Sequence, residues 1–442
     1  MALKTGRKPA GAKNSPSRKQ FLPPAKTRFA IAQSALNPTP IVANANIAII
    51  GAGAAGLMAA ITAAVYSPRA SIVLLDSREK IGAKILISGG TRCNVTNVEV
   101  TPSDYQGGPS HFVRHVLEAF TPQQTIEFFK KIGVELVLEP SGKYFPVTHS
   151  GKTVLDALSR EADRAGVKLT TGVRIEKIKR VETSFQLESG SFKLLAQRVI
   201  LATGGLSYPE TGSDGTGFRI AGGLGHTIVS TSPALTPLTT DDEEWKSLSG
   251  ISLDAALSFF KNGRKKQECT GAFLFTHFGF SGPVALDISR HAARCGQGED
   301  YEIRANFVPQ ASEESLKKKI ALFEANRGKK SIEGFLQKEF SLPERFVKTF
   351  LKKIGTQERR KIIQFLLSYP LPVSGVVGYK KAEVTAGGVD LNEVRHSTME
   401  SKRVPGLYFC GEILDVDGRI GGFNFQWAWS SGVVAGRGAV QS

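Results

Sequence analysis

Three glycines and one aspartate are the first residues whose types and spacing could do chemistry together. Gly51, Gly53 and Gly56 follow the pattern G-x-G-x-x-G. The first permits a tight turn, the second lets the backbone approach a pyrophosphate, and the third allows a helix to pack closely on a strand. Asp76 lies 20 residues beyond Gly56, where an acid accepts a hydrogen bond from a ribose hydroxyl. An acid rather than an arginine there favours a ribose without a 2′-phosphate, as in FAD or NAD.

The elements needed to position these residues follow in the right order. Residues 46–50 and 70–76 are apolar runs typical of buried strands, and the alanine-rich residues 57–66 are typical of a helix. This order predicts a βαβ unit with the glycine turn between its first strand and its helix. The helix N-terminus would offer free N–H groups and a partial positive charge to phosphates. A glycine-rich turn that binds no ligand is the alternative interpretation.

Two later segments favour FAD over NAD. Residues 198–205 (RVILATGG) predict a buried strand ending in Ala-Thr-Gly, the pattern at which flavoproteins of the glutathione reductase type return to the FAD. Residues 406–412 (GLYFCGE) predict another strand, and its terminal Glu412 would place a carboxylate on the ribityl chain. A simple NAD dehydrogenase needs neither segment, so together they favour FAD.

Two long blocks are unusual: residues 84–97 (KILISGGTRCNVTN) and residues 406–433 (GLYFCGEILDVDGRIGGFNFQWAWSSGV). Shorter blocks between them are ATGGLSYPETG at 202–212, FLFTHFGFSGP at 273–283, VTAGGV at 384–389 and TMESK at 398–402. Over about residues 46–438, these blocks resemble the BaiN-like family of NAD(P)/FAD-dependent oxidoreductases, the aminoacetone-oxidase-like flavoproteins of the glutathione reductase type. The chain departs from the family at Thr91, where a third glycine is usual, in the reordered turn at 212–217, and in its basic leader.

The resemblance implies an α/β fold: a Rossmann-like FAD-binding domain split in sequence, with an inserted β-barrel-like domain and a small helical domain. The sequence pattern agrees with this domain arrangement, because short runs typical of β-strands after residue 206 are followed by helical periodicity at 312–368. The expected boundaries are a basic disordered leader at 1–45, FAD-binding segments at 46–206 and 385–442, β-barrel-like segments at 207–285 and 369–384, and a mainly helical insert at 286–368.

The polar residues of the two long blocks suit a flavin nucleotide. Lys84 and Arg92 could meet the pyrophosphate or a flavin carbonyl, and Asn94 belongs to a loop that could line the isoalloxazine. Glycines before a helix at 425–434 would aim the helix N-terminus at the flavin N1/C2 carbonyl, stabilising the anion formed on reduction. Solvated loop residues are the alternative for these side chains, and Asp417 is as readily a turn residue. The expected FAD contacts are Gly51, Gly53, Ala54, Ala55, Gly56, Asp76, Ser77, Lys84, Ser88, Gly89, Arg92, Asn94, Val173, Ala202, Thr203, Gly204, Gly411, Glu412, Asp417, Gly421, Gly422 and Asn424.

Other residues could carry redox or acid–base chemistry. Asp214 begins a stretch that partly resembles the Asp-Gly motif of flavin monooxygenases but lacks its serine. Cys93 could be a redox thiol, although no second cysteine is close in sequence, and a packed loop cysteine is favoured. His277 is the candidate catalytic residue because it lies in a block that resembles the family. A structural histidine is the alternative for His277 and for His226.

The charge and cysteine patterns constrain partners and location. The net charge is +17, but residues 1–45 hold eight basic residues and no acid, so the other 397 residues carry 49 basic against 40 acidic ones. We therefore expect a small-molecule substrate and no nucleic acid partner. Four scattered cysteines predict no metal site, and the glycines within the apolar residues 46–65 argue against integral membrane association. We expect a cytoplasmic protein, or an organellar one if residues 1–45 are a transit peptide.

The sequence predicts an FAD-dependent oxidoreductase in which a hydride passes through flavin N5. Since no second G-x-G-x-x-G unit is visible, NAD(P)H would dock transiently as the electron donor, or the electrons would come from the substrate. A reductase that uses NAD(P)H on a carbonyl-conjugated alkene is favoured. The alternatives are an amine oxidase that uses oxygen, and an FAD-containing protein that binds or modifies RNA.

Overall fold

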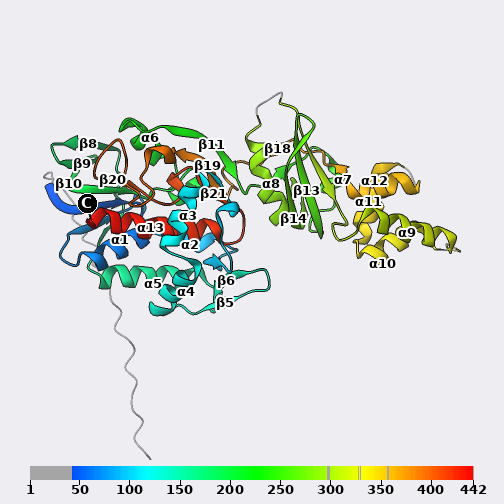
Figure 1. Ribbon diagram of the computed structural model, residues 1–442, viewed down its shortest axis with the longest axis horizontal. Helices are drawn as coiled ribbons and strands as arrows, with labels where there is room; N and C mark the ends of the chain where they lie inside the picture. Colours follow the sequence, from blue (N-terminus) through cyan, green and yellow to red (C-terminus); the bar gives the residue numbers. More distant parts are fainter. Residues whose placement is uncertain (1–41, 296–298, 327, 329, 356–357, 442) are drawn as a thin grey trace, which may run out of the picture. The chain divides into compact units, whose positions relative to one another are not determined.

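The computed structural model describes residues 42–441 except 296–298, 327, 329, 356 and 357. The leader predicted at 1–45 therefore lies, up to residue 41, outside the described residues. Five parallel strands form the core of a seven-stranded sheet with the order β7-β2-β1-β10-β9-β8, and β20 lies beside β10 (Figure 1). β8 and β9 extend it in antiparallel fashion. The strands are β1 (Val42–Ile50), β2 (Ile72–Leu75), β7 (Lys168–Thr170), β8 (Lys177–Val181), β9 (Ser184–Ser189), β10 (Phe192–Leu201) and β20 (Leu407–Phe409).

Helices cover this sheet because its parallel strands are apolar on both faces, as in the fully buried β2. The largest helix contact joins α1 (Ala54–Tyr66) and α13 (Phe423–Gln441), which lie side by side in Figure 1. Glycines allow this close approach, since a Cβ on Gly436 would lie 2.5 Å from the Ala59 carbonyl oxygen. The other helices of this part are α2 (Ala83–Ile87), α3 (Ser110–Ala119), α4 (Pro122–Lys131), α5 (Gly151–Arg164) and α6 (Thr216–Gly223).

Small sheets and single turns connect these layers. β3, β6 and β5 form a three-stranded sheet, β4 pairs with β21, and β11 pairs with β19. Their bounds are β3 (Thr96–Asn97), β4 (Tyr105–Gly107), β5 (Leu136–Leu138), β6 (Lys143–Pro146), β11 (Ile228–Ala234), β19 (Val384–Val389) and β21 (Val416–Gly418). The 3-10 turns are η1 (Pro102–Asp104), η2 (Pro209–Thr211), η3 (Leu391–Glu393) and η4 (Gly411–Ile413).

The insertion is built on a second seven-stranded sheet, antiparallel throughout, with the order β17-β16-β13-β14-β15-β12-β18. Helix α8 packs on its strands. The strands are β12 (Leu238–Thr239), β13 (Ser252–Lys261), β14 (Arg264–Thr276), β15 (Gly279–Ser281), β16 (Tyr301–Asn306), β17 (Tyr369–Pro370) and β18 (Gly375–Val376). The helices are α7 (Glu243–Lys246), α8 (Pro283–Ala293), α9 (Glu313–Ala325), α10 (Ile332–Phe340), α11 (Glu344–Ile354) and α12 (Arg359–Leu367).

Buried side chains divide the described residues into two large cores. The first belongs to the parallel sheet, and the second joins the antiparallel sheet to helices α9–α12 around Trp245 and Phe346. These cores confirm the predicted α/β fold class. Helix α6 packs in the first core through Phe218 and Ile220, whereas the boundary predicted at 206 assigned it to the insertion. The apolar face of α6 draws this helix into the first core, and a change in sequence pattern after residue 206 does not reveal that face. The other predicted domain boundaries stay predictions.

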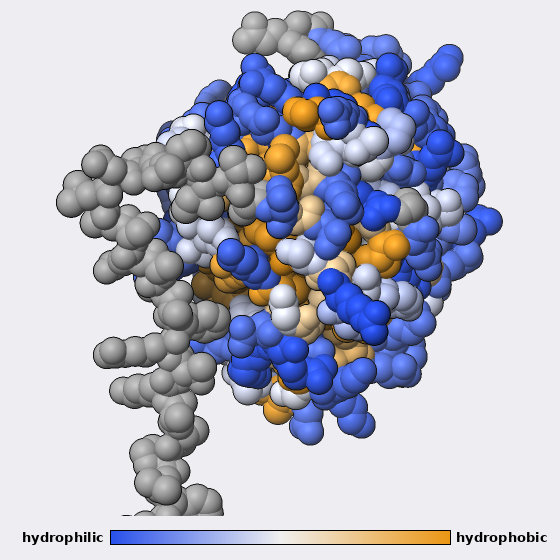
Figure 2. Space-filling view, turned by 90° about the vertical axis from the view of Figure 1, so that its left-hand side faces the viewer, coloured by the Kyte–Doolittle hydropathy of each residue, from blue (hydrophilic) through white to orange (hydrophobic). Residues whose placement is uncertain are grey.

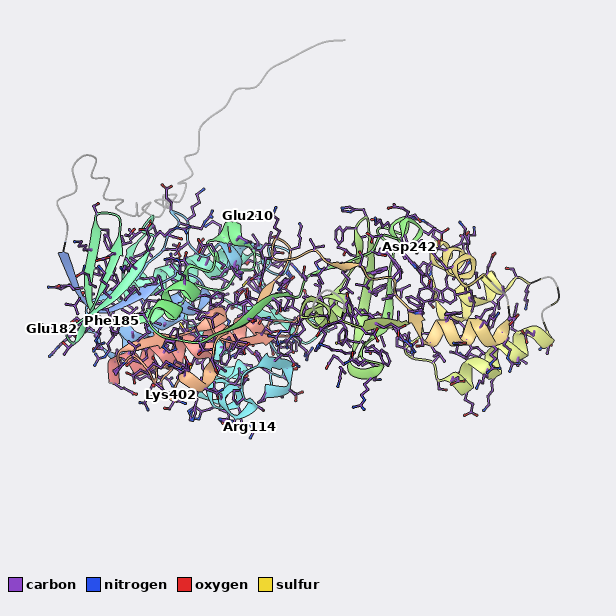
Figure 3. The ribbon with its side chains drawn as sticks, turned by 90° about the horizontal axis from the view of Figure 1, so that it is seen from above. Arg114, Glu182, Phe185, Glu210, Asp242 and Lys402 are labelled. Atoms are coloured by element: carbon purple, nitrogen blue, oxygen red, sulfur yellow. The ribbon has the colours of Figure 1, made fainter. Side chains whose placement is uncertain are left out.

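Polar contacts cap helix α7 of the insertion, which begins after Asp242 (labelled in Figure 3). The Asp242 carboxylate accepts hydrogen bonds from Glu244 N and Trp245 N and pairs with Lys353. On the face shown in Figure 2, apolar surface lies between hydrophilic side chains. Exposed apolar residues occur singly, as Leu322, or in short pairs, as Val65 with Tyr66, and exposed apolar side chains are normal on a protein surface. In the described part of the chain, no helix has the length and apolar character needed to cross a membrane.

Candidate functional site

A cavity of about 550 Å³ opens where parallel strands of the first sheet end. β1 is followed by Gly51, β2 by Asp76 and β10 by Ala202, and all three residues line this cavity. Ligands of open α/β sheets bind at such carboxyl ends. Every expected FAD contact lines the cavity except Gly56 and Asp417. The structure thus brings together segments that lie more than 300 residues apart in the sequence.

The glycine turn has the geometry that a pyrophosphate requires. Gly51 has φ +105°, and a Cβ there would lie 2.4 Å from the Ala202 carbonyl oxygen. Gly56 packs beneath the turn, where a Cβ would lie 1.8 Å from the Gly51 oxygen. A Cβ on Gly53 would meet no protein atom within 4 Å, so its backbone borders open space. Helix α1 begins at Ala54 without a side-chain cap, which leaves its first N–H groups free for an anion.

Asp76 ties the turn to the end of β2. Its carboxylate accepts hydrogen bonds from Ala52 N and Arg78 N, both at 2.8 Å. Burial raises the pKa of this carboxyl, and the two backbone hydrogen bonds offset part of the rise. Because each oxygen can accept more than one hydrogen bond, the carboxylate can also hold a ribose. The residues at this end of the cavity therefore fit the adenosine and pyrophosphate of a dinucleotide.

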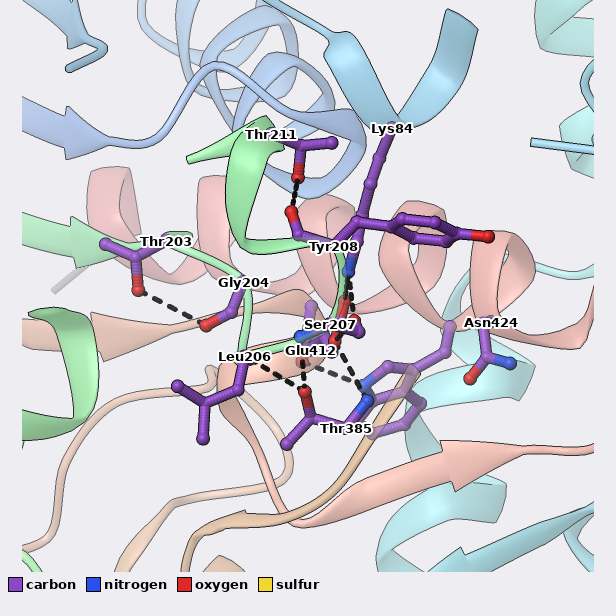
Figure 4. A network of polar contacts seen from close by, with 12 residues as sticks. Lys84, Thr203, Gly204, Leu206, Ser207, Tyr208, Thr211, Thr385, Glu412 and Asn424 are labelled. Carbon is purple, nitrogen blue, oxygen red and sulfur yellow. Dashed lines mark hydrogen bonds and ion pairs between the residues drawn. The ribbon is translucent and has the colours of Figure 1, made fainter. Parts of the chain in front are cut away.

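A polar network forms the middle of the cavity wall (Figure 4). Glu412 is bonded to Lys84, to the Ser207 hydroxyl and, at 2.9 Å, to Thr385 N. Lys84 Nζ also donates to Ser207 Oγ at 2.6 Å. The network joins α2, the segment after β10, β19 and η4. Glu412 thus holds four chain segments together, a role that its sequence pattern did not predict.

The far end of the cavity lies beside the start of α13. Gly422 (φ +96°) precedes this helix, and a Cβ there would lie 2.7 Å from the Thr96 carbonyl oxygen. The buried Oδ1 of Asn94 has no hydrogen-bond partner among the described residues. A free acceptor beside a helix N-terminus fits a flavin ring, which carries an N–H beside carbonyl oxygens. The Asn424 side chain instead bonds the backbone of Gly418 at 2.8 and 2.9 Å, so it positions the loop.

Arg92 is held on the protein side of the cavity rim. Its Nη1 lies 2.6 Å from Glu139 Oε1, and its guanidinium lies 4.1 Å from the centre of the Phe145 ring. Both contacts engage the guanidinium group with other protein side chains, although Arg92 still lines the cavity. The predicted contact of Arg92 with the cofactor stays a prediction.

Asp417 lies away from the cavity, in a pair with a buried arginine. Its Oδ1 is 3.0 Å from Arg290 Nη2 of α8, and both side chains are less than a tenth exposed. Burial raises the pKa of Asp417 to about 6, and Arg290 offsets part of this rise. The pair joins β21 to the inserted helix α8, so it has a structural explanation without a ligand.

His277 occupies the exposed turn between β14 and β15 and does not line the cavity. This geometry lends no support to its predicted catalytic role. His226 is buried, with Nδ1 3.0 Å from Glu393 Oε2 and Nε2 2.8 Å from Ser401 Oγ. The interpretation of His226 as a structural histidine is confirmed.

Cys93 is fully buried, and burial raises its pKa to about 12. Because the thiolate is the reactive form, the buried thiol favours the interpretation of a packed cysteine over a redox thiol. Asp214 caps α6 through Thr216 N at 3.0 Å and pairs with Arg174. These contacts explain the Asp-Gly stretch without monooxygenase chemistry.

In the described ranges no group of three or more His, Cys, Asp or Glu side chains is arranged to hold a metal ion.

Several cavity residues escaped the sequence analysis, among them Lys143 on β6, Tyr208 and Glu383. Glu383 immediately precedes the 384–389 block, which is the one signal that could have drawn attention to it. Lys143 and Tyr208 carry no comparable spacing signal. They reach the cavity only because β6 and the segment after β10 fold against its far end.

Together, the parallel sheet, the glycine turn and the cavity define a Rossmann-type nucleotide-binding protein. The chain belongs to the family described as "HI0933-like protein Rossmann domain", whose model matches residues 45–438. This confirms the predicted family of FAD-dependent oxidoreductases and the Rossmann-like FAD-binding fold.

Curated relatives cover nearly the whole chain. The 3-dehydro-bile acid delta(4,6)-reductase of Clostridium scindens is 33% identical over 407 residues, which span 89% of this chain and 99% of the relative. The ribosomal RNA dihydrouridine synthase of Escherichia coli is 34% identical over 396 residues, or 87% of this chain and 95% of the relative. A solved 3-ketosteroid-delta4-(5alpha)-dehydrogenase of Rhodococcus jostii matches with 14% identity and a TM-score of 0.47, covering 90% of this chain and 97% of that one.

Proposed function

We propose that this chain is an FAD-dependent reductase that adds hydrogen across a C=C bond conjugated to a carbonyl group. The observation that carries the proposal is the cavity of about 550 Å³, which joins the glycine turn to a polar far end. The names of both curated relatives describe the same chemistry. The delta(4,6) double bonds of a 3-dehydro-bile acid are conjugated to its 3-carbonyl group, and the C5–C6 bond of uracil is conjugated to its C4 carbonyl group.

The residues of the cavity would hold FAD along its length. Asp76 would bind the adenosine ribose, and the Gly53 backbone with the α1 N-terminus would bind the pyrophosphate. Asn94 Oδ1 would accept a hydrogen bond from the flavin ring. The N-terminus of α13 favours negative charge on its neighbour. When bound, FAD supplies hydride acceptance and hydride release.

We further propose that NAD(P)H is the electron donor and docks transiently, because no second G-x-G-x-x-G unit is present in the sequence. Anaerobic mixing of the holoenzyme with NADPH or NADH should bleach the flavin absorbance. Addition of 2-cyclohexenone should restore it and give the saturated ketone. An enzyme that is reduced only by amines, and that releases peroxide in air, would be an oxidase and would contradict the proposal.

A uridine within RNA is the second candidate substrate. The 34% identity to a ribosomal RNA dihydrouridine synthase supports it. Lys80 and Arg174 also line the cavity at the end that holds Asp76. These observations argue against our sequence-based expectation that nucleic acid is not a partner.

A uridine-containing RNA oligonucleotide tests this candidate. Incubation with holoenzyme and NADPH should add two hydrogen atoms per modified uridine, which mass spectrometry detects. Binding of the RNA should weaken steeply with salt, since each phosphate contact releases counterions. Turnover of 2-cyclohexenone without any RNA modification or salt-dependent RNA binding would limit the substrate to small molecules.

A further inference from the structure

The far end of the cavity holds a carboxylate that the contacts described so far do not use. Glu383 lies just before β19 and lines the cavity. Its backbone N–H donates to the Leu235 carbonyl oxygen at 3.1 Å, which fixes the residue in place. No hydrogen bond or ion pair joins its carboxylate to another described side chain. The backbone of Glu383 is thus anchored at the cavity wall, and its carboxylate is open to a ligand.

Charged and titratable groups from several elements face Glu383. Lys143 of β6 and Lys84 of α2 lower the pKa of its carboxyl, whereas Asp287 of α8 raises it. The Glu383 side chain is exposed to the open cavity, but the protein atoms packed around it still outweigh these charges by disfavouring the ionised form, and the pKa of Glu383 is raised. Glu383 in turn raises the pKa of Tyr208, whose side chain also lines the cavity. A glutamate with these neighbours can hold a proton closer to neutral pH than an ordinary one can.

Contacts of the same groups place Glu383 near the flavin end rather than the adenosine end. Asp287 accepts a hydrogen bond from Ile420 N at 2.7 Å, and residue 420 adjoins the glycines that precede α13. Lys84 belongs to the Glu412 network in the middle of the wall. Val384, the next residue in the chain, belongs to an apolar cluster against which Ile420 packs. A substrate stacked on the flavin would therefore lie close to this carboxyl group.

We propose that Glu383 is the proton donor that completes reduction of the C=C bond, an inference that rests on the proposed function. A hydride from the flavin, itself reduced by NAD(P)H, bonds to the alkene carbon remote from the carbonyl. The π electrons of the C=C bond move toward the carbonyl oxygen and form an enolate. The proton of the Glu383 carboxyl then bonds to the carbon next to the carbonyl, and water entering the cavity reprotonates the carboxylate.

The first test separates this step from flavin reduction. Holoenzyme is reduced with dithionite without oxygen and mixed with 2-cyclohexenone or with a uridine-containing RNA oligonucleotide, and flavin reoxidation is followed. Glu383→Gln should slow reoxidation about 10²- to 10⁴-fold, the usual contribution of a positioned acid, while its FAD content and its reduction by NADPH are unchanged. The matched control is Glu118→Gln, on the exposed surface of α3, which should leave reoxidation unchanged. Reoxidation of Glu383→Gln within about threefold of wild type would overturn the proposal, as would a loss seen with Tyr208→Phe instead.

The pH profile gives the second test, because Glu383 must be protonated to act. Reoxidation by wild type should slow as pH rises through the pKa of Glu383. Lys143→Met removes a charge that lowers this pKa, so the decline should move to higher pH. Asp287→Asn removes a charge that raises it, so the decline should move to lower pH. Shifts in the same direction for both variants, or none, would contradict the role of Glu383.

A third readout does not depend on turnover. Glutamate labelled with carbon-13 in its carboxyl group reports protonation by NMR, and the Glu383→Gln spectrum identifies the signal. The proposal requires titration above the ordinary glutamate range, with Lys143→Met and Asp287→Asn moving it in opposite directions. Titration at or below the ordinary value overturns it. Failure of wild type to pass electrons to either alkene would instead defeat the proposed function, whatever the titration shows.

Discussion

The two ends of the cavity are built in different ways. The end at the glycine turn presents mainly backbone groups, with the Asp76 carboxylate, from residues 51–77 and from the segment that follows β10. The far end uses charged and polar side chains from distant segments, among them Lys143, Glu383 and Glu412. Backbone recognition needs glycine at fixed spacing, so it leaves a pattern in the sequence. Recognition by side chains needs only that the fold bring them together, and this leaves no fixed spacing.

The largest expected effect concerns the packing beneath the turn. Gly56→Ala places a Cβ 1.8 Å from the Gly51 carbonyl oxygen, and neither backbone can move away without disrupting α1. We expect destabilisation by more than about 4 kcal/mol, among the largest effects of single substitutions, measured by urea unfolding. A Gly56→Ala protein as stable as wild type would show that this glycine is not required by packing.

Gly53→Val tests the other glycine of the same turn. Its Cβ meets no protein atom within 4 Å, so the fold should tolerate valine. The branched side chain would occupy the space of the pyrophosphate, and FAD affinity should fall at least about 100-fold, or roughly 3 kcal/mol. The measurement is a titration of apo-protein with FAD beside a thermal melt. Full FAD affinity in a folded Gly53→Val protein would refute the assignment of the turn.

Asp417 tests whether the join between β21 and α8 is structural. Burial raises its pKa to about 6, above the ordinary 3.8, so the unfolded chain loses this proton more readily than the folded one. The contribution of Asp417 to the free energy of unfolding is therefore fully present below about pH 4. It is lost as pH rises through about 6, and the total loss is roughly 3 kcal/mol at most. Urea unfolding between pH 4 and 7 should show the decline in wild type and a weaker one in Asp417→Asn. Equal slopes for both proteins would contradict the buried assignment.

Glu412 tests the side-chain network in the middle of the wall. Glu412→Ala leaves Lys84 and Ser207 without their shared partner, and it removes the acceptor predicted for a ribityl hydroxyl. We expect FAD affinity to fall about fivefold to a hundredfold, or roughly 1–3 kcal/mol, and Glu412→Gln to lose less. ADP-ribose, which reaches only the glycine turn and Asp76, should bind both variants normally. Equal losses for both ligands would indicate damage to the whole site.

The smallest effect is expected for thiol modification. Burial raises the pKa of Cys93 to about 12, and Cys410 is also fully buried. Cys269 and Cys295 are partly exposed, so iodoacetamide should label them first. Flavin content and turnover should not change during this labelling, as mass spectrometry and absorbance can follow. Rapid labelling of Cys93 with loss of turnover would restore the redox-thiol interpretation.

The sequence alone determined the dinucleotide end of the cavity and the fold class. Only glycine allows the tight turn and the close approaches of this end, so the turn is visible in the sequence. Apolar runs of strand length alternate with helical periodicity, so the fold class is visible as well. The same logic located the end of β10 and the turn before α13, because each is a glycine-rich segment that follows a strand or precedes a helix.

The tertiary structure alone decided which side chains meet. The sequence suggested both Glu412 and, with a turn residue as an equal alternative, Asp417 as cofactor contacts, yet Asp417 is buried against Arg290 and Glu412 lines the cavity. His277 lies inside a family-type block and on an exposed turn, whereas Glu383 lies just outside the 384–389 block and lines the cavity. Burial and charge at these positions depend on contacts between segments hundreds of residues apart, and local spacing carries no information about them.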